Sequence, residues 1–233
     1  MKKLIVLLVS VVVLSATAQD NPKYLNVLAV NGLNMRSQPD SKARIVTKVM
    51  YGKRVEVMEK TKTELQLGWI KDNWIKVKYR GREGYIFGGY LSELAAPTGL
   101  SETKLLADLL PTYCANAFKP KGAPILTKEV ETDGDVLNHA LHVFAGGQEL
   151  EIEQRKERRT TKLLLNSTIL ETYVLLEALL KQSGNTQLLD ELRFVKGKDG
   201  NLLRINDAAG TVSIKQFSDE KTELQLMSYL LEN

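Results

Sequence analysis

The chain has 233 residues, 43% of them hydrophobic and 26% charged, with a formal net charge of +4 at pH 7. Such a composition is typical of a globular protein with room for one large or two small domains. The small net charge, spread without a long block of like charges, gives no case for nucleic-acid binding. The single cysteine, Cys114, excludes an intramolecular disulfide.

The first 18 residues have the pattern of an export signal. Lys2 and Lys3 precede an apolar run over Leu4–Leu14, and Ala16–Ala18 fits a small-x-small cleavage site. The alternative, a retained membrane anchor, is disfavoured because a spanning helix needs about 20 apolar residues. We therefore expect a signal peptide over residues 1–18. The mature chain would be periplasmic or extracellular, without stable membrane insertion.

Residues 24–94 consist of short runs in which apolar and polar residues alternate. Val55 and Val57 alternate with polar neighbours, and the segment Trp74–Tyr79 alternates in the same way. Turn residues separate the runs, as in the glycine-rich stretch Arg80–Gly84. About five or six short strands without a long helical pattern predict a small antiparallel barrel.

Four motifs follow one another in this region. The first is Gly32–Asp40, which reads Gly-Leu-Asn-Met-Arg-Ser-Gln-Pro-Asp. The second pairs Gly52 with Val55, and the third is Trp74-Ile75-Lys76-Val77. The last lies within Gly81–Ser92 and contains Gly-x-x-Gly-Tyr-Ile followed by Tyr-Leu-Ser.

These motifs resemble those of bacterial SH3-like (SH3b) domains, which carry Leu-Asn-Val-Arg-Ser-x-Pro, Gly-x-x-Val, Trp-x-x-Val, Gly-x-x-Gly-Trp-Val and Tyr-Leu-Ser. Met35, Gln38 and Tyr85 replace the usual valine, glycine and tryptophan. The resemblance covers about residues 24–94 and implies an all-β SH3-like small barrel. It also implies a module of exported or cell-wall proteins, which often binds peptidoglycan or peptides.

Aromatic side chains are the candidates for ligand contact, because they offer apolar area with polar tips at low entropic cost. The segment Lys60–Asn73 is longer than the loop that usually precedes the family's tryptophan, and we expect a loop that either shapes or blocks the groove. Trp69 on this loop is expected at the groove rim, and Trp74 in the core. Tyr85 is expected to serve the core as well, since core packing is the commoner use of aromatic residues. The ligand-binding candidates are Trp69, Tyr51, Tyr79, Tyr85 and Tyr90.

The rest of the chain resembles no family. Residues 95–101 have the composition of a linker, and residues 102–233 predict an α+β domain with an antiparallel sheet and about two helices. One helix is expected over Ser101–Ala117, ended or kinked near Pro111. The other is expected over Thr168–Lys181, where Thr168 and Glu171 form a capping box.

A cell-wall cysteine peptidase of the NlpC type is the enzyme alternative, because SH3b modules often accompany such enzymes. The mechanism needs a thiolate beside an oriented histidine. Cys114 lies in Thr-Tyr-Cys-Ala-Asn, not in the Asp-Cys-Ser-Gly of that family, and it is expected to be buried in a helix face. We therefore predict a structural thiol and no catalytic residue.

No cofactor or metal site is predicted. His139 and His142 lie three residues apart in a segment that looks like a strand, so their side chains should point to opposite faces. Glu149, Glu151 and Glu153 share one face of the next expected strand. Paired carboxylates can perform acid–base catalysis, but a polar outer face is the commoner reason for this pattern.

Together these observations predict an exported, non-enzymatic binding protein whose SH3b-like module recognises peptidoglycan or a peptide or protein ligand. Residues 19–96 carry more basic than acidic side chains, which favours anionic partners such as cell-wall polymers. An ordinary solvated surface is the alternative reading of this charge. A pure scaffold, whose barrel binds a protein partner, is the other alternative, and residues 102–233 indicate no function.

Overall fold

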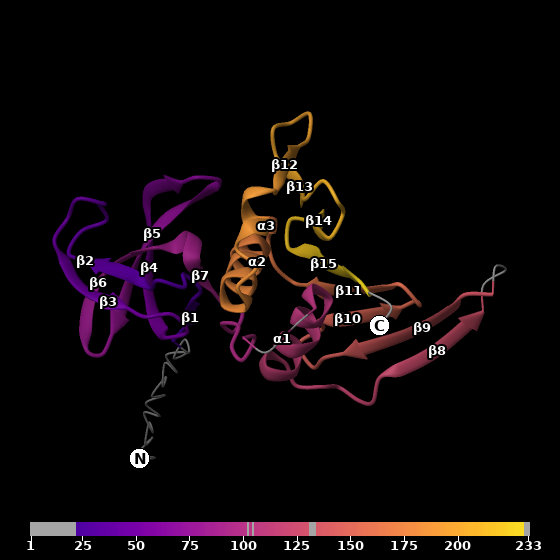
Figure 1. Cartoon of the computed structure of the whole chain (residues 1–233). Helices are drawn as coiled ribbons and strands as arrows, with labels where there is room; N and C mark the ends of the chain where they lie inside the picture. Colours follow the sequence, from indigo (N-terminus) through magenta and orange to yellow (C-terminus); the bar gives the residue numbers. More distant parts are fainter. Residues whose placement is uncertain (1–21, 102, 104, 131–133, 231–233) are drawn as a thin grey trace, which may run out of the picture.

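The structure is a computed structural model that describes residues 22–101, 103, 105–130 and 134–230. The predicted signal peptide lies outside the described residues. Two antiparallel sheets dominate the fold, a curled N-terminal sheet and a larger C-terminal sheet, and helix α2 (Ile169–Ser183) lies between them (Figure 1).

The curled sheet has seven antiparallel strands in the order β3-β2-β6-β5-β4-β1-β7. Its core is formed by inward-pointing side chains such as Val27, Met35, Val55, Val77 and Ile86, all of them fully buried. The predicted all-β architecture of this region is therefore confirmed, in the form of a curled sheet. The strands are β1 Tyr24–Val27, β2 Leu33–Arg36, β3 Ile45–Val49, β4 Arg54–Leu67, β5 Ile70–Tyr79, β6 Arg82–Phe87 and β7 Leu91–Ser92.

The first sequence motif forms β2 and the turns on either side of it. Gly32 has a φ of +73°, and a Cβ at this position would lie 2.7 Å from the carbonyl oxygen of Val49, so only glycine fits. At the other end of β2, the Arg36 guanidinium donates a hydrogen bond of 2.6 Å to the Ala43 carbonyl oxygen. This motif therefore serves the architecture of the sheet.

The prediction of a loop over Lys60–Asn73 is wrong. Strands β4 and β5 continue through this segment as a two-stranded antiparallel ribbon, with the pairs Glu64–Asn73 and Leu67–Ile70. Gly68, whose φ is +59°, makes the tight turn at the tip. The strand pattern is hard to see in the sequence because few apolar residues interrupt the Lys, Thr, Glu and Gln of this segment.

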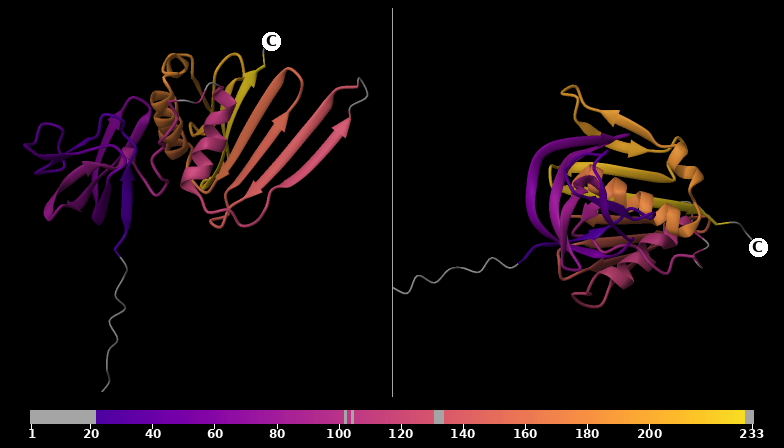
Figure 2. Two further views of the ribbon diagram at one scale, coloured as in Figure 1. Left: turned by 60° about the horizontal axis from the view of Figure 1, so that its bottom comes forward. Right: turned by 90° about the vertical axis from the view of Figure 1, so that its left-hand side faces the viewer.

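The C-terminal sheet has eight antiparallel strands in the order β12-β13-β14-β15-β11-β10-β9-β8. Helices α1 and α2 pack on the same face of it, because residues of both helices share one core with alternate residues of the strands (Figure 2). The strands are β8 Ile125–Val130, β9 Val136–Val143, β10 Glu149–Gln154, β11 Arg158–Leu165, β12 Arg193–Lys196, β13 Leu202–Asn206, β14 Val212–Ser218 and β15 Lys221–Tyr229.

Helix α2 lies where the sequence predicts it, and the Thr168 half of the predicted capping box is present, whereas the Glu171 carboxylate bonds to Ser92. The Thr168 side chain accepts a hydrogen bond of 3.2 Å from the backbone N–H of Glu171, which caps the N-terminus. Gly184 ends the helix in the left-handed conformation with a φ of +81°. Leu175, Leu176 and Leu179 are fully buried, so one face of the helix packs in the core.

The first predicted helix needs correction. The segment begins only at the 3₁₀ turn η2 (Leu106–Asp108), continues as α1 (Leu109–Ala117) and is not capped by Ser101. Pro111 lies in the first turn of α1 and does not end it. The first backbone N–H groups of a helix have no carbonyl partner within it, so proline is tolerated there. A third, short helix is α3, Gln187–Asp190.

Candidate functional site

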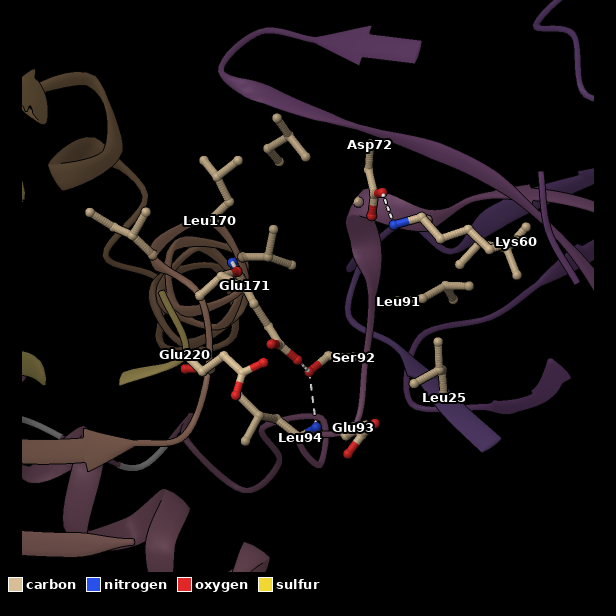
Figure 3. A pocket seen from close by; sticks show the side chains of 18 of the residues that line it. Leu25, Lys60, Asp72, Leu91, Ser92, Glu93, Leu94, Leu170, Glu171 and Glu220 are labelled. Carbon is tan, nitrogen blue, oxygen red and sulfur yellow. Dashed lines mark hydrogen bonds and ion pairs between the residues drawn. The ribbon is translucent and has the colours of Figure 1, made fainter. Parts of the chain in front are cut away.

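A cleft of about 810 Å³ lies between the curled sheet and the N-terminal end of α2 (Figure 3). One wall comes from β1, β4, β5 and β7, and the other from α2 and the β14–β15 turn. Residues that line the cleft include Lys23, Lys60, Ile70, Lys71, Asp72, Ser92, Glu93, Leu170, Glu171, Val174, Asp219 and Glu220.

Ser92 and Glu171 join the two walls. The Ser92 hydroxyl donates a hydrogen bond of 2.5 Å to Glu171 Oε1 and accepts one of 2.9 Å from the Leu94 backbone N–H (Figure 3). Burial raises the pKa of the Glu171 carboxyl, although the hydrogen bond from Ser92 opposes this shift. The sequence marks Glu171 only as a helix-capping residue, and no local pattern indicates that its carboxylate reaches β7.

The charged residues of the cleft carry both signs. On the curled sheet, Lys60 Nζ lies 3.1 Å from Asp72 Oδ1, and Lys23 Nζ lies 2.5 Å from Glu93 Oε1. The facing β14–β15 turn contributes Asp219 and Glu220. Exposed ion pairs of this kind add little to stability, so their groups can exchange partners with a charged ligand at small cost. The cleft is therefore suited to a ligand that carries both amines and carboxylates.

Trp69, expected at a groove rim, instead contacts the C-terminal sheet. Its ring stacks on Phe194 of β12 with centroids 4.4 Å apart and planes 8° apart. The Lys196 ammonium lies 5.5 Å from the centre of the Trp69 ring, a cation–π arrangement. Phe194 also packs edge-on against Tyr173 of α2, with centroids 5.3 Å apart. Trp69 is half exposed even in this stack, so the prediction that it also contacts a ligand stays a prediction.

Two other candidate tyrosines also face the C-terminal part of the chain. Tyr51 donates a hydrogen bond of 2.7 Å from its hydroxyl to the Pro97 carbonyl oxygen. Tyr90 packs with Phe87 and with Val174 of α2 in a small core between the two sheets. Burial raises the pKa of both tyrosines, and Glu177 raises that of Tyr90 further. The segment predicted as a linker is therefore packed against the curled sheet at Pro97.

Tyr79 and Tyr85 remain on the curled sheet, away from these contacts. Tyr79 packs against the sheet's own core, and the Arg80 guanidinium lies 5.3 Å from its ring centre. Tyr85, also expected in the core, is instead half-buried, opposite Lys76 of β5 and Arg36 of β2. None of the five candidate aromatics lines the cleft. Trp74, expected in the core, is 4% exposed and is confirmed there.

Comparison with known families bears on the curled sheet. Residues 31–92 match the family model described as bacterial SH3 domain. This part of the chain is a bacterial SH3 domain. The match covers most of the curled sheet and ends at Ser92, the residue that bonds to Glu171. No curated protein and no solved structure shows a significant match to the chain.

The one cysteine of the chain, Cys114, lies in α1, outside the SH3 domain. Its side chain is 1% exposed and packs in the core of the C-terminal sheet. Burial raises the pKa of its thiol, which disfavours the thiolate that a cysteine nucleophile requires. The geometry is that of a buried structural cysteine.

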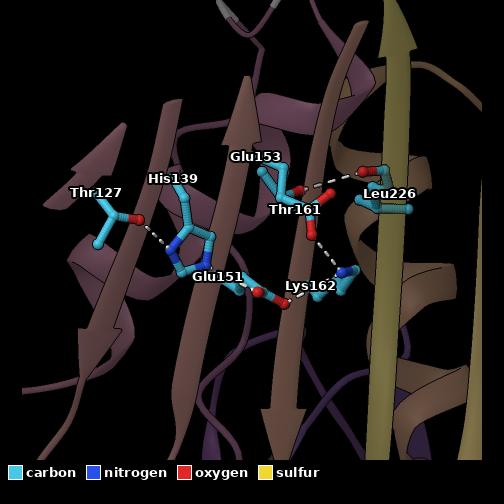
Figure 4. A network of polar contacts seen from close by, with 7 residues as sticks. All are labelled: Thr127, His139, Glu151, Glu153, Thr161, Lys162 and Leu226. Atoms are coloured by element: carbon cyan, nitrogen blue, oxygen red, sulfur yellow. Dashed lines mark hydrogen bonds and ion pairs between the residues drawn. The ribbon is translucent and has the colours of Figure 1, made fainter. Parts of the chain in front are cut away.

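A polar network lies on the sheet face opposite the helices (Figure 4). Lys162 donates to Glu151 at 3.2 Å and to Glu153 at 2.6 Å, and His139 Nε2 lies 2.8 Å from Glu151 Oε1. Burial tends to raise the pKa of Glu151, but hydrogen bonds from His139 and Lys162 outweigh it and lower the pKa. His142 pairs with Leu150 on the other face, as predicted.

Both carboxylates accept from the one Lys162 ammonium, so the network resembles a cross-strand charge ladder more than an acid–base pair. Among the described residues, no group of three His, Cys, Asp or Glu side chains is placed to hold a metal ion. Within the same part of the chain, no helix has the length and apolar character needed to cross a membrane.

Proposed function

We propose that this protein is an exported, non-enzymatic binding protein whose SH3 domain and helix α2 together hold a peptide-like ligand. The peptide portion of peptidoglycan is the ligand class that fits best. The observation that carries the proposal is the cleft of about 810 Å³, whose two walls come from the SH3 domain and from the α2 side. A cavity of this size can enclose most of a small ligand.

The chemistry of the cleft supports a peptide with free amines and carboxylates. Lys23, Lys60 and Lys71 on the SH3 side provide partners for carboxylates, and Asp219 and Glu220 provide partners for amines. The cross-linking peptides of peptidoglycan carry both kinds of group. Bacterial SH3 domains bind peptidoglycan or proteins, which agrees with this ligand class.

Two further observations support the remaining parts of the proposal. The basic, apolar and small-residue pattern of residues 1–18 supports export. The burial of Cys114 and the raised pKa of its thiol support a binding role in place of cysteine hydrolysis.

Retention of the mature chain on purified peptidoglycan, measured at several salt concentrations, tests the function. The variant Glu220→Arg reverses one charge in the cleft, and Glu129→Arg makes the same change on β8, outside the cleft. We expect wild type and Glu129→Arg to be retained alike at low salt, and Glu220→Arg to be retained several-fold less.

Absence of retention of the wild type at low salt would contradict the peptidoglycan ligand and favour a protein partner. Equal retention of Glu220→Arg and Glu129→Arg would show that peptidoglycan binds elsewhere on the protein. Muropeptides labelled with a fluorophore provide an independent measurement, because binding of a soluble fragment excludes trapping of the protein in the polymer mesh.

A further inference from the structure

The outer half of the β4–β5 ribbon, residues 64–73, is set apart from the rest of the SH3 domain by an irregularity in strand pairing. The register shifts between Lys60 and Glu64, so residues 61–63 have no paired partner in β5. Thr61 bridges the gap: its hydroxyl donates to the Trp74 carbonyl oxygen at 2.8 Å, and its own carbonyl accepts from the Asn73 amide at 2.8 Å. A bulge of this kind bends a ribbon and weakens its ladder locally.

Beyond this bulge the ribbon leaves the SH3 core and reaches the C-terminal sheet. Most of its side chains are exposed, including Glu64, Gln66 and Leu67. At its tip, Trp69 stacks on Phe194 and Ile70 joins the small core that contains Val174, and Leu65 packs against the same core. The outer ribbon is therefore held by the bulge at one end and by Trp69, Ile70 and Leu65 towards the other.

The ribbon also forms one end of the cleft. Ile70, Lys71 and Asp72 line the cleft directly after the tip, and Leu170 and Val174 of α2 line it on the other side. Figure 3 shows Asp72 on the SH3 side facing Leu170 and Glu171 across the cavity. Any movement of the tip away from Phe194 would therefore move a wall of the cleft.

We propose that residues 64–73 form a strap that closes one end of the cleft, with the bulge at 61–63 as its hinge and Phe194 as its latch. The strap opens when Trp69 unstacks from Phe194, and opening gives a ligand access to the cleft. The closing motion is a property of the chain itself. Its effect on ligand access rests on the proposed binding function.

The contact between Trp69 and the latch Phe194 is suited to reversible opening. Trp69 remains 50% exposed while stacked, so unstacking exposes only part of its apolar surface. Two further anchors lie in the same small core: Ile70, which follows Trp69 and is 3% exposed, and Leu65, which is only partly buried. Local structures with few buried contacts open more readily than the global fold, which is the behaviour expected of a lid.

Hydrogen exchange of backbone amides in the full mature chain tests the strap without a ligand. The variant Phe194→Ala removes the latch, and Val195→Ala changes the next residue of β12, whose side chain points to the other face of the strand. We expect Phe194→Ala to raise the exchange rates of residues 64–72 by about tenfold and to leave the SH3 core unchanged, as local opening predicts. Val195→Ala should leave the strap at wild-type rates.

Tryptophan fluorescence provides the second measurement. Trp74 is 4% exposed and Trp69 is 50% exposed, so quenching by acrylamide reports mainly on Trp69. Phe194→Ala and Phe194→Leu should both increase the quenching of Trp69 fluorescence. The leucine variant keeps most of the apolar volume, so it still tests the strap if the alanine variant folds poorly. Unchanged exchange and quenching in both Phe194 variants would overturn the strap.

Ligand kinetics then separate the strap from the binding function. Labelled muropeptide should associate faster with Phe194→Ala than with wild type. If the wild type binds no muropeptide, the proposed ligand is wrong, while the exchange data still decide the strap. If exchange rises in the variant but association is unchanged, the strap exists and does not control access to the cleft, which overturns its role as a gate.

Discussion

Trp69 of the SH3 domain and Phe194 of the C-terminal sheet stack face to face, with ring centroids 4.4 Å apart and planes 8° apart. The contact joins the tip of one β-ribbon to the edge strand of the other sheet. Together with the small core around Val174 and the bond between Ser92 and Glu171, it holds the SH3 domain against α2. A tryptophan predicted to serve a ligand is thus used between two parts of one chain.

The two tryptophans should differ sharply in their contribution to stability. Trp74→Ala removes a buried ring and should lower the free energy of unfolding by about 3–5 kcal/mol. Trp69→Ala removes a half-exposed stacked ring and should cost about 1 kcal/mol, the scale of one aromatic pair. Thermal melts of both variants measure the difference. Equal losses would mean that Trp69 is a core residue, in conflict with its exposure.

Cys114 should behave as a structural thiol. Because its side chain is buried and its pKa is raised, iodoacetamide should label it only after the protein is denatured. Mass spectrometry after timed alkylation, with and without denaturant, measures this. Rapid labelling of the native protein near neutral pH would instead support the cysteine-peptidase alternative.

The network around Glu151 should make stability depend on pH at the acidic end. The folded state lowers the pKa of Glu151 below its unfolded value of about 4.3, so the carboxylate stabilises the fold above that pH. This contribution is lost as pH falls through the lower, folded-state pKa. The stability difference between wild type and Glu151→Gln should therefore be largest near neutral pH and shrink in acid, as measured by urea unfolding.

A double-mutant cycle tests the source of that pH dependence. Lys162 donates to Glu151 in the structure, so the effect of Glu151→Gln should be smaller when Lys162→Met is already present. Additive effects of the two substitutions would show that the Lys162 contact does not stabilise the folded carboxylate.

The N-cap of α2 should be worth about 1 kcal/mol, the usual contribution of a threonine cap. Thr168→Ala removes the acceptor for the Glu171 backbone N–H, whereas Thr168→Ser keeps it. Chemical denaturation should therefore show a loss for the alanine variant and nearly wild-type stability for the serine variant. A similar loss in both would mean that the Thr168 methyl group, and not the hydroxyl, supports the helix.

Much of the local structure could be predicted from the sequence, because it depends on interactions between residues that are close in the chain. The alternation of Val55 and Val57 and the motif around Gly32 predicted β-structure, which the structure contains. Thr168 and Gly184 marked the ends of α2 correctly, since helix caps involve only neighbouring residues. The end or kink predicted near Pro111 was wrong because proline is compatible with the first turn of a helix as well as with a helix end.

The candidate site could not be predicted, because its contacts join residues that are distant in the sequence. The amino-acid order by itself determined an SH3 domain, a capped helix and a chain without an intramolecular disulfide. Only the tertiary structure decided that Glu171 bonds to Ser92, 79 residues away, and that Trp69 meets Phe194. These pairings depend on how the SH3 domain packs against α2 and the second sheet. That packing is set by apolar surfaces such as Ile70, Phe87 and Val174, whose mutual burial leaves no periodic pattern in the sequence.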